Sequence, residues 1–146
     1  MPGLMANWNI PGGLRGGELQ GPGFGRGNPI VLSGQSSLQV TIAWQGNPSD
    51  APQSLKGYFV FSPAEDGSQD APSPFLNNSG NYVCSDTQTA GKSSGPGNNV
   101  QYVFNGYQYG GGLVGHYELT FVAEWLPSGA TVPTQWSADP EFETGN

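Results

Sequence analysis

Glycine and proline occur so often along this chain that a long helix has no room to form. Of its 146 residues, 24 are glycine and 13 are proline, and both residue types interrupt helices. Between them lie short runs in which apolar and polar residues alternate, the pattern of half-buried strands bounded by turns. The sequence therefore predicts an all-β protein. It also argues against α/β folds, whose parallel strands are joined by crossover helices.

Two segments, residues 37–45 and 116–126, show the alternation most clearly. Their predicted inward faces consist of Leu38, Val40, Ile42 and Trp44, and of Tyr117, Leu119, Phe121, Ala123 and Trp125. Further strands are predicted at residues 30–32, 56–62, 81–84, 100–104, 134–137 and 141–144. Seven or eight short strands with long loops predict an antiparallel β-sandwich, immunoglobulin-like in outline. A jelly roll or a small barrel is the second choice.

The segment 56–62 differs from the others because it is apolar on both faces. This pattern indicates a central strand that is covered on both sides, or a strand whose outer face meets a partner. Proline favours edge positions, so residues 134–137 and 141–144, which lie next to Pro133 and Pro140, are expected to form edge strands.

Domain organisation follows from the distribution of glycine. Residues 1–28 form a glycine-rich arm that carries Trp8, Ile10 and Phe24 as apolar anchors. We expect this arm to lie on the domain or on a neighbouring subunit, with a disordered tail as the alternative. Residues 29–146 are expected to form a single β-sandwich domain. Within it, residues 64–80, 85–99 and 107–112 are predicted to be loops, and Asn105-Gly106 gives a turn signal.

Charge and cysteine content restrict the partners. The formal net charge is −7, and the four basic residues, Arg15, Arg26, Lys56 and Lys92, are far apart in sequence. Nucleic acids and anionic membranes both require clustered Lys and Arg, so neither is expected as a partner. No recognisable secretory signal occurs in the first thirty residues, and the single Cys84 cannot form an intrachain disulfide. A cytoplasmic protein is therefore predicted.

No arrangement of residues indicates catalysis, so we expect a protein that is not an enzyme and has no cofactor or metal. One histidine (His116) and one cysteine are too few for a zinc site of the His/Cys type. Cys84 is expected to be a small buried hydrophobic residue. Glu118 and Glu124 share a strand face about 20 Å apart, whereas glycosidase carboxylates lie within about 10 Å of each other.

Two groups of acidic residues are predicted to be solvated rather than to bind calcium. They are Glu65, Asp66 and Asp70 in the first long loop, and Asp139, Glu141 and Glu143 near the C-terminus. The first group lacks the ligand pattern of an EF-hand. Alternate spacing places the second group on one side of a terminal strand, where repulsion suits an exposed edge.

Aromatic residues in or beside predicted loops are the best candidates for a binding site. Tyr107, Tyr109 and Trp136 are predicted to be exposed, where their rings could stack on a sugar or on a partner side chain. The alternative for the two tyrosines is that they pack over the sheet.

The C-terminal third resembles small bacterial proteins of the inclusion-body AidA/PixA kind and the related DP-EP proteins. The residues that carry the resemblance are Tyr117-Glu118-Leu119-Thr120-Phe121 and Trp136-Ser137-Ala138-Asp139-Pro140-Glu141. The resemblance covers about thirty residues, and the arm and the loop at 64–80 have no counterpart in it. It implies a β-sandwich in which self-association or ligand binding is more plausible than catalysis, and it brings no catalytic residues.

These observations predict a non-enzymatic β-sandwich that acts by self-association or by binding a protein partner. The features behind this prediction are the apolar segment 56–62, the arm and the low content of charged residues, 10%, because the cores of interfaces are depleted in charge. The alternative is a carbohydrate-binding module that uses Tyr107, Tyr109 and Trp136.

Overall fold

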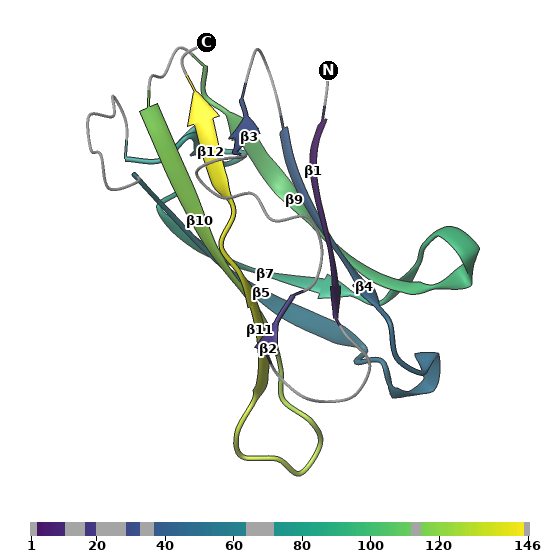
Figure 1. Ribbon diagram of the computed structural model, residues 1–146. Coiled ribbons are helices and arrows are strands. Elements are labelled where there is room, and N and C mark those ends of the chain that lie inside the picture. The colour runs from purple at the N-terminus through teal and green to yellow at the C-terminus, as the bar shows by residue number, and fades with distance from the viewer. Residues whose placement is uncertain are drawn as a thin grey trace.

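In the computed structural model, residues 3–10, 17–19, 29–32, 37–63, 72–111 and 115–144 are described. They form two β-sheets that face each other (Figure 1). The larger sheet contains β2 (Gly17–Glu18), β3 (Ile30–Val31), β5 (Ser54–Pro63), β7 (Ser85–Gly91), β10 (Gly115–Trp125), β11 (Thr134–Ala138) and β12 (Glu141–Thr144). The smaller sheet contains β1 (Gly3–Ile10), β4 (Ser37–Trp44), β6 (Phe75–Leu76), β8 (Ser93–Ser94) and β9 (Val100–Tyr109).

The larger sheet is built around β10. One side of β10 pairs with β5 in antiparallel register, and β5 in turn pairs with β7. The other side of β10 pairs with β11 near its end and with β12 near its start. The short strands β2 and β3 then pair in parallel with β11 and β12. The expectation that residues 134–137 and 141–144 form edge strands is therefore wrong, because strands from the first third of the chain flank them.

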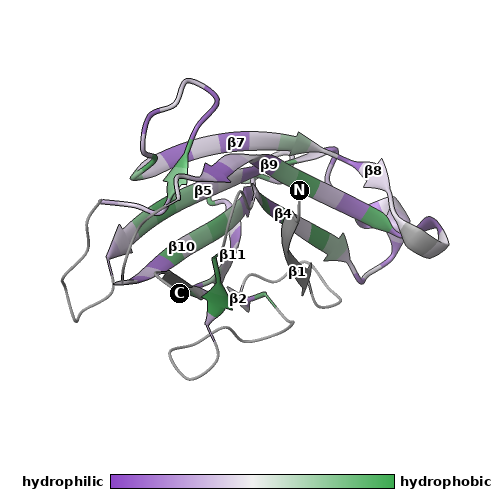
Figure 2. Cartoon of the chain, turned by 90° about the horizontal axis from the view of Figure 1, so that it is seen from above, coloured by the Kyte–Doolittle hydropathy of each residue, from purple (hydrophilic) through white to green (hydrophobic). Residues whose placement is uncertain are grey.

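Apolar side chains alternate along the strands of both sheets and meet between them. Figure 2 shows hydrophobic bands along β4, β5, β9 and β10, whereas β7 is mostly hydrophilic. Phe59 lies at the centre of this core, with its ring centroid 5.8 Å from that of Phe104 on the opposite sheet and 4.9 Å from that of Phe121. Trp44 of the smaller sheet and Trp136 of the larger sheet make an edge-to-face contact at 6.2 Å. Such offset geometries are favourable for aromatic pairs.

The predicted all-β sandwich is confirmed, including the inward faces of residues 37–45 and 116–126. Leu38, Val40, Ile42 and Trp44 are buried, as are Tyr117, Leu119, Phe121 and Ala123, while Trp125 at the end of β10 is half-buried. The described residues contain twelve strands rather than seven or eight. No helix among them is long and apolar enough to cross a membrane. Their helical segments are the short 3₁₀ turns η1 (Pro48–Asp50) and η2 (Pro96–Asn98).

Two predicted loops are strands in the structure. Residues 85–91 form β7, whose hydroxyl and amide side chains give no alternating pattern; the strand forms because β5 offers its free edge. Residues 107–109 continue β9 through Asn105-Gly106, which forms a bulge instead of a turn. Leu38 pairs with Tyr107 and Val40 with Phe104, so β9 has one extra residue there. Gly106 has a φ of 110°, a conformation that suits glycine in a bulge.

The remaining expectations on chain organisation have mixed outcomes. In the predicted loop 64–80, residues 64–71 lie outside the described residues, and Phe75 in β6 is fully buried. Tyr82 forms an isolated bridge to Leu76 rather than a strand at 81–84. Within the predicted arm, β1 pairs in parallel with β4 of the same chain. The division into an arm of residues 1–28 and a domain of residues 29–146 stays a prediction.

Candidate functional site

The three aromatic residues predicted to form an exposed platform are buried in the core. Tyr107 is 3% exposed, Tyr109 is 7% exposed and Trp136 is fully buried. The prediction that they are exposed is therefore wrong. The two tyrosines point inward because β9 continues as a strand past its bulge. Trp136 is buried because the middle of β11 pairs with β10, which directs the indole toward Trp44.

Tyr107 has a role in joining the two sheets. Its hydroxyl donates a hydrogen bond of 2.6 Å to Oδ2 of Asp86 on β7. Burial, together with the neighbouring Asp86 carboxylate, raises the pKa of Tyr107 well above the ordinary tyrosine value. Next to this contact, the Gln88 side chain donates to the main-chain oxygen of Asn105 at 2.8 Å. These bonds connect β7 of the larger sheet to β9 of the smaller sheet.

Other residues singled out in the sequence are dispersed. Cys84 is exposed, so its predicted burial is wrong, because it directly precedes β7 at the surface. His116 lies near the start of β10, opposite Glu143 of β12. Glu65, Asp66 and Asp70 lie outside the described residues. In the described part of the chain, no group of three or more His, Cys, Asp and Glu residues could hold a metal ion.

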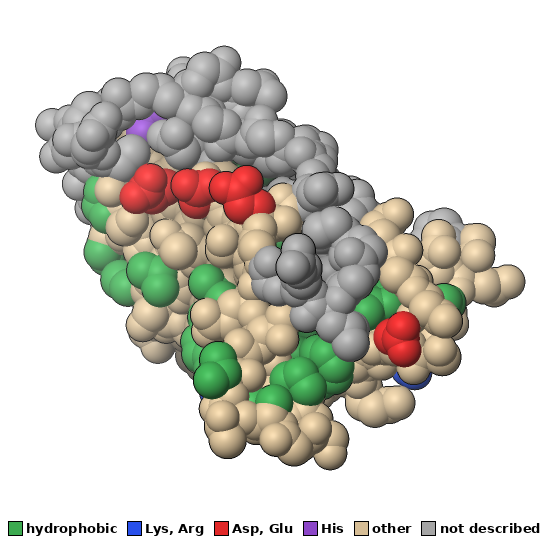
Figure 3. Space-filling model, turned by 60° about the horizontal axis from the view of Figure 1, so that its bottom comes forward, with side chains coloured by type: hydrophobic (Ala, Val, Ile, Leu, Met, Phe, Trp, Pro, Cys, Tyr) green, Lys and Arg blue, Asp and Glu red, His purple; other side chains and the backbone are tan. Residues whose placement is uncertain are grey.

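Two glutamate positions lie opposite each other in the register of β10 and β12. Glu118 lies opposite Glu141 in the register of the two strands, and Asp139, just before β12, is exposed. In the described part of the chain acidic side chains also gather, since Figure 3 shows several of them side by side on one face of the molecule. Repulsion between like charges disfavours an anionic partner at such a face.

The side of β5 and β10 that points away from the core forms an open sheet face, here called the outer face. It consists of Lys56, Tyr58, Val60 and Ser62 on β5 and of Glu118, Thr120, Val122 and Glu124 on β10. Their cross-strand pairs are Lys56 with Glu124, Tyr58 with Val122, Val60 with Thr120, and Ser62 with Glu118. Val60 is 45% exposed, and Tyr58 and Val122 are half-buried. The segment 56–62 is therefore not covered on both sides, and the alternative that its outer face meets a partner stays a prediction.

A hydrogen-bonded group at one end of the outer face is centred on Glu124. The hydroxyl of Tyr58 donates to its Oε2 at 2.8 Å, and the amide of Gln135 donates to its Oε1 at 2.8 Å. The Lys56 ammonium lies 5.0 Å from the centroid of the Tyr58 ring. The pKa of Glu124 is lowered, chiefly by the hydrogen bond from Tyr58, then by that from Gln135 and by the charge of Lys56. Glu124 is therefore held as a carboxylate that accepts two hydrogen bonds.

The lowered pKa of Glu124 predicts how stability depends on pH. A carboxyl group whose pKa is lower in the folded state stabilises the fold above its unfolded pKa, and this contribution is lost as the pH falls through its folded pKa. We expect Glu124→Gln to lower the free energy of unfolding at neutral pH, and we expect the difference from wild type to shrink below pH 4.5. Urea unfolding at a series of pH values from neutral to below 4.5 measures this difference in the free energy of unfolding. Tyr58→Phe removes one of the two hydrogen bonds to Glu124 and is expected to reduce the same pH dependence. A difference that stays constant with pH would contradict the assignment.

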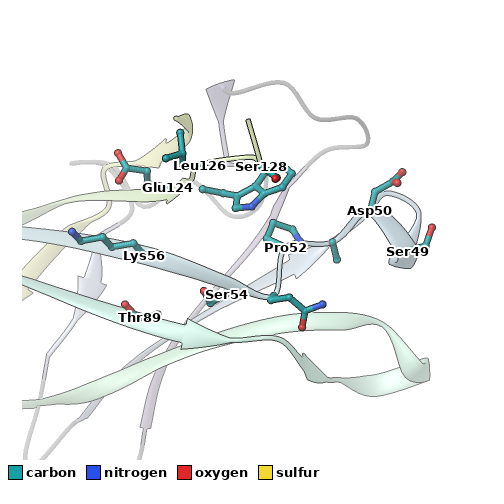
Figure 4. Close-up of a pocket in the computed structure, with 12 residues that line it drawn as sticks. Ser49, Asp50, Pro52, Ser54, Lys56, Thr89, Glu124, Leu126 and Ser128 are labelled. Carbon is teal, nitrogen blue, oxygen red and sulfur yellow. The ribbon is translucent and has the colours of Figure 1, made fainter. Parts of the chain in front are cut away.

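A pocket of about 690 Å³ opens beside this end of the outer face. It is lined by Ser49, Asp50, Ala51, Pro52, Gln53, Ser54, Lys56, Thr89, Glu124, Trp125, Leu126 and Ser128. Figure 4 shows Ser49 and Asp50 at one end of the pocket and Lys56, Thr89 and Glu124 at the other. The wall therefore combines apolar side chains with hydroxyl groups, carboxylates and one ammonium group.

Core residues hold the connection between β4 and β5 that forms one wall of the pocket. The Trp44 indole donates to the main-chain oxygen of Asn47 at 3.0 Å, and the Asn47 side chain accepts from the main-chain N–H of Ser49, which caps η1. The buried Tyr102 hydroxyl donates to the main-chain oxygen of Pro52 at 2.5 Å. Burial raises the pKa of Tyr102 to about 12, so it stays a donor at physiological pH. This wall is thus positioned by side chains anchored in the core.

The sequence did not indicate this pocket. Trp125 is the last inward residue of β10, and the alternating pattern places it in the core like the residues before it. The structure leaves it half-buried because the strand ends there. Asp50 and Glu124 come together with Trp125 only through the pairing of β5 with β10. A tryptophan at the end of an apolar stripe, followed by Pro127 and Gly129, was the one available signal.

Comparison with known proteins identifies no relative of this chain. No family model matches it, no curated protein matches it significantly, and no solved structure does so. The resemblance of the C-terminal third to AidA/PixA and DP-EP proteins therefore stays a prediction.

Proposed function

We propose that this protein is a non-enzymatic β-sandwich that acts by self-association, and that two copies meet through their outer faces. The observation that supports this proposal is the position of Val60. It lies in the middle of the larger sheet, between paired strands, and is 45% exposed, with the half-buried Tyr58 and Val122 beside it. An apolar centre with charged residues toward the ends is the usual composition of a protein–protein interface.

The pairing of β5 with β10 makes the outer face complementary to itself. A twofold axis can lie parallel to the strands, above the outer face and midway between β5 and β10. Rotation about this axis brings each residue of β5 opposite its own cross-strand partner on β10 of the second copy. Lys56 then faces Glu124 of the second copy, Tyr58 faces Val122, and Val60 faces Thr120. This reciprocity is what a twofold interface requires. Aligned packing of sheets about 10 Å apart is a common way for two β-layers to meet.

A substitution on the outer face tests this arrangement. Val60→Lys places an ammonium group against Thr120 of the second copy, and we expect the dissociation constant to rise at least about tenfold, equivalent to about 1.4 kcal/mol. Adding Thr120→Glu gives each lysine an opposite charge across the interface and is expected to restore association. Sedimentation velocity and native mass spectrometry report the dimer as a species of twice the 15.3 kDa monomer mass.

The matched control for this test is Val132→Lys. Val132 is 74% exposed in the connection between β10 and β11, and its replacement is expected to leave the dissociation constant unchanged. Equal melting temperatures for all variants would separate an effect on association from an effect on folding. If the wild-type protein is monomeric at high micromolar concentration, self-association is contradicted. Binding of a different protein to the outer face is then the remaining alternative.

Two features support a non-enzymatic protein in a reducing compartment. Glu118 and Glu124 both lie on the outer face of β10, six residues apart, and at about 3.3 Å per residue they cannot act as the pair of carboxylates of a glycosidase. The thiol of Cys84 is exposed, and such a thiol stays reduced in the cytoplasm. A cytoplasmic location is proposed on that ground.

A further inference from the structure

We propose that the pocket beside the end of the outer face is a binding site for a neutral saccharide. Trp125 contributes a half-buried indole to its wall, and Pro52 and Leu126 extend the apolar part of that wall. The face of an aromatic ring carries partial negative charge, so it attracts the C–H groups on one side of a sugar ring. This site is different from the predicted platform, whose three aromatic residues are buried.

The polar groups of the pocket match the hydroxyl groups of such a ligand. Ser49, Ser54, Thr89 and Ser128 provide hydroxyls, and Gln53 provides an amide; all five are exposed. Hydroxyls and amides both donate and accept hydrogen bonds. Asp50 and Glu124 add carboxylate oxygens, which accept charge-assisted bonds from hydroxyl donors. A few convergent polar groups beside an apolar wall are typical of ligand sites.

The charges of the pocket disfavour anionic ligands. Among the described residues of the wall, Lys56 is the only cation; it lies with Glu124 at one end of the pocket, and the Asp50 carboxylate lies at the other (Figure 4). Its ammonium group also lies 5.0 Å from the centroid of the Tyr58 ring and opposite Glu124 in the register. A phosphate or an acidic sugar would meet a net negative wall. A neutral polyhydroxylated ligand avoids this repulsion and still uses the carboxylates as acceptors.

The wall of the pocket is held by regular structure and anchored turns. Lys56, Thr89 and Glu124 come from adjacent strands of the larger sheet, and Pro52 is held by the hydrogen bond from Tyr102. A rigid wall lowers the entropy cost of binding. Because Ser49 and Asp50 lie at the opposite end from Glu124 (Figure 4), a ligand that spans the pocket contacts both ends. This arrangement favours an oligosaccharide over a single sugar ring.

The test is titration of the full-length protein with cellohexaose, xylohexaose, mannohexaose and chitohexaose, followed by calorimetry and by ¹H–¹⁵N NMR. We expect at least one of these hexasaccharides to bind and to shift the indole resonance of Trp125, while that of the fully buried Trp136 stays unchanged. Trp125→Ala is expected to weaken binding at least tenfold, and Val132→Ala, outside the pocket, is the matched control. Absence of binding by all four hexasaccharides, or binding without a shift at Trp125, would overturn the proposal.

This inference goes beyond self-association, and the pocket shares Lys56 and Glu124 with the outer face. Val60 does not line the pocket, so the Val60→Lys variant, whose dimerisation is weakened, is expected to bind the hexasaccharide at least as tightly as the wild type; binding by this variant tests the pocket separately from the dimer. Trp125 points to the core side of β10 and lies outside the outer face, so Trp125→Ala is expected to keep the dimer. Should Trp125→Ala fold poorly, the NMR shift of the wild-type indole still decides the question.

Discussion

Replacement of Phe59 by alanine is expected to lower the free energy of unfolding by about 3–5 kcal/mol. Phe59 is 1% exposed, and its ring lies within 6.2 Å, between centroids, of the rings of Phe61, Phe104, Tyr107 and Phe121. These neighbours come from both sheets, so the ring fills the space between the layers. The strands around it are paired on both sides and cannot move inward to close the cavity. The loss is comparable to the whole stability of a marginal domain.

Urea unfolding followed by tryptophan fluorescence measures this loss. Val60→Ala, measured at protein concentrations where the chain is monomeric, is the matched control, since Val60 is the next residue of β5 but points to the outer face, and we expect its replacement to cost well under 1 kcal/mol. If Phe59→Ala and Val60→Ala destabilised the protein equally, the assignment of inner and outer faces of β5 would be wrong.

Replacement of Gly57 by alanine is the second prediction, with an expected loss of about 1–3 kcal/mol from overpacking. A Cβ atom at this position would lie 2.7 Å from Cε1 of Phe104, well inside van der Waals contact. Phe104 is 1% exposed and packs against Phe59 and Phe121, so its ring has no free space to enter. Gly57 thus lets a core aromatic ring lie directly against the backbone of β5.

The matched control is Gly91→Ala. Gly91 lies at the end of β7, next to β5, and an added Cβ would meet no atom within 4 Å. We expect this variant to be neutral or slightly stabilising, since alanine restricts the unfolded chain more than glycine does. In a Phe104→Leu background the loss from Gly57→Ala is expected to shrink, which a double-mutant cycle reports. If the loss from Gly57→Ala is the same in the Phe104→Leu background, contact with the Phe104 ring is not the cause of the destabilisation.

The candidate sites show where sequence reasoning succeeds and where it fails. The apolar segment 56–62 pointed to β5, and the structure separates its residues into a core face with Phe59 and Phe61 and an open face with Tyr58 and Val60. Local alternation could not show that Tyr107 continues a strand. An Asn-Gly pair predicts a turn in isolation, and only pairing with β4 turns it into a bulge.

The pocket was beyond prediction for a related reason. Lys56 and Trp125 are far apart in the chain and line one pocket because β5 and β10 pair along eight residues. Likewise, β7 has no hydrophobic pattern of its own and becomes a strand because β5 presents an unpaired edge.

The all-β class and the inward faces of β4 and β10 follow from local pattern alone, since a side-chain period of two and frequent turn residues are local properties. The tertiary structure decided which strands pair, which aromatic residues are buried and where polar groups converge. Burial depends on the sheet that lies opposite, and pairing depends on edges that distant segments supply. The local pattern of residues specifies neither burial nor strand pairing. The outer face and the Trp125 pocket therefore form only when the two sheets assemble.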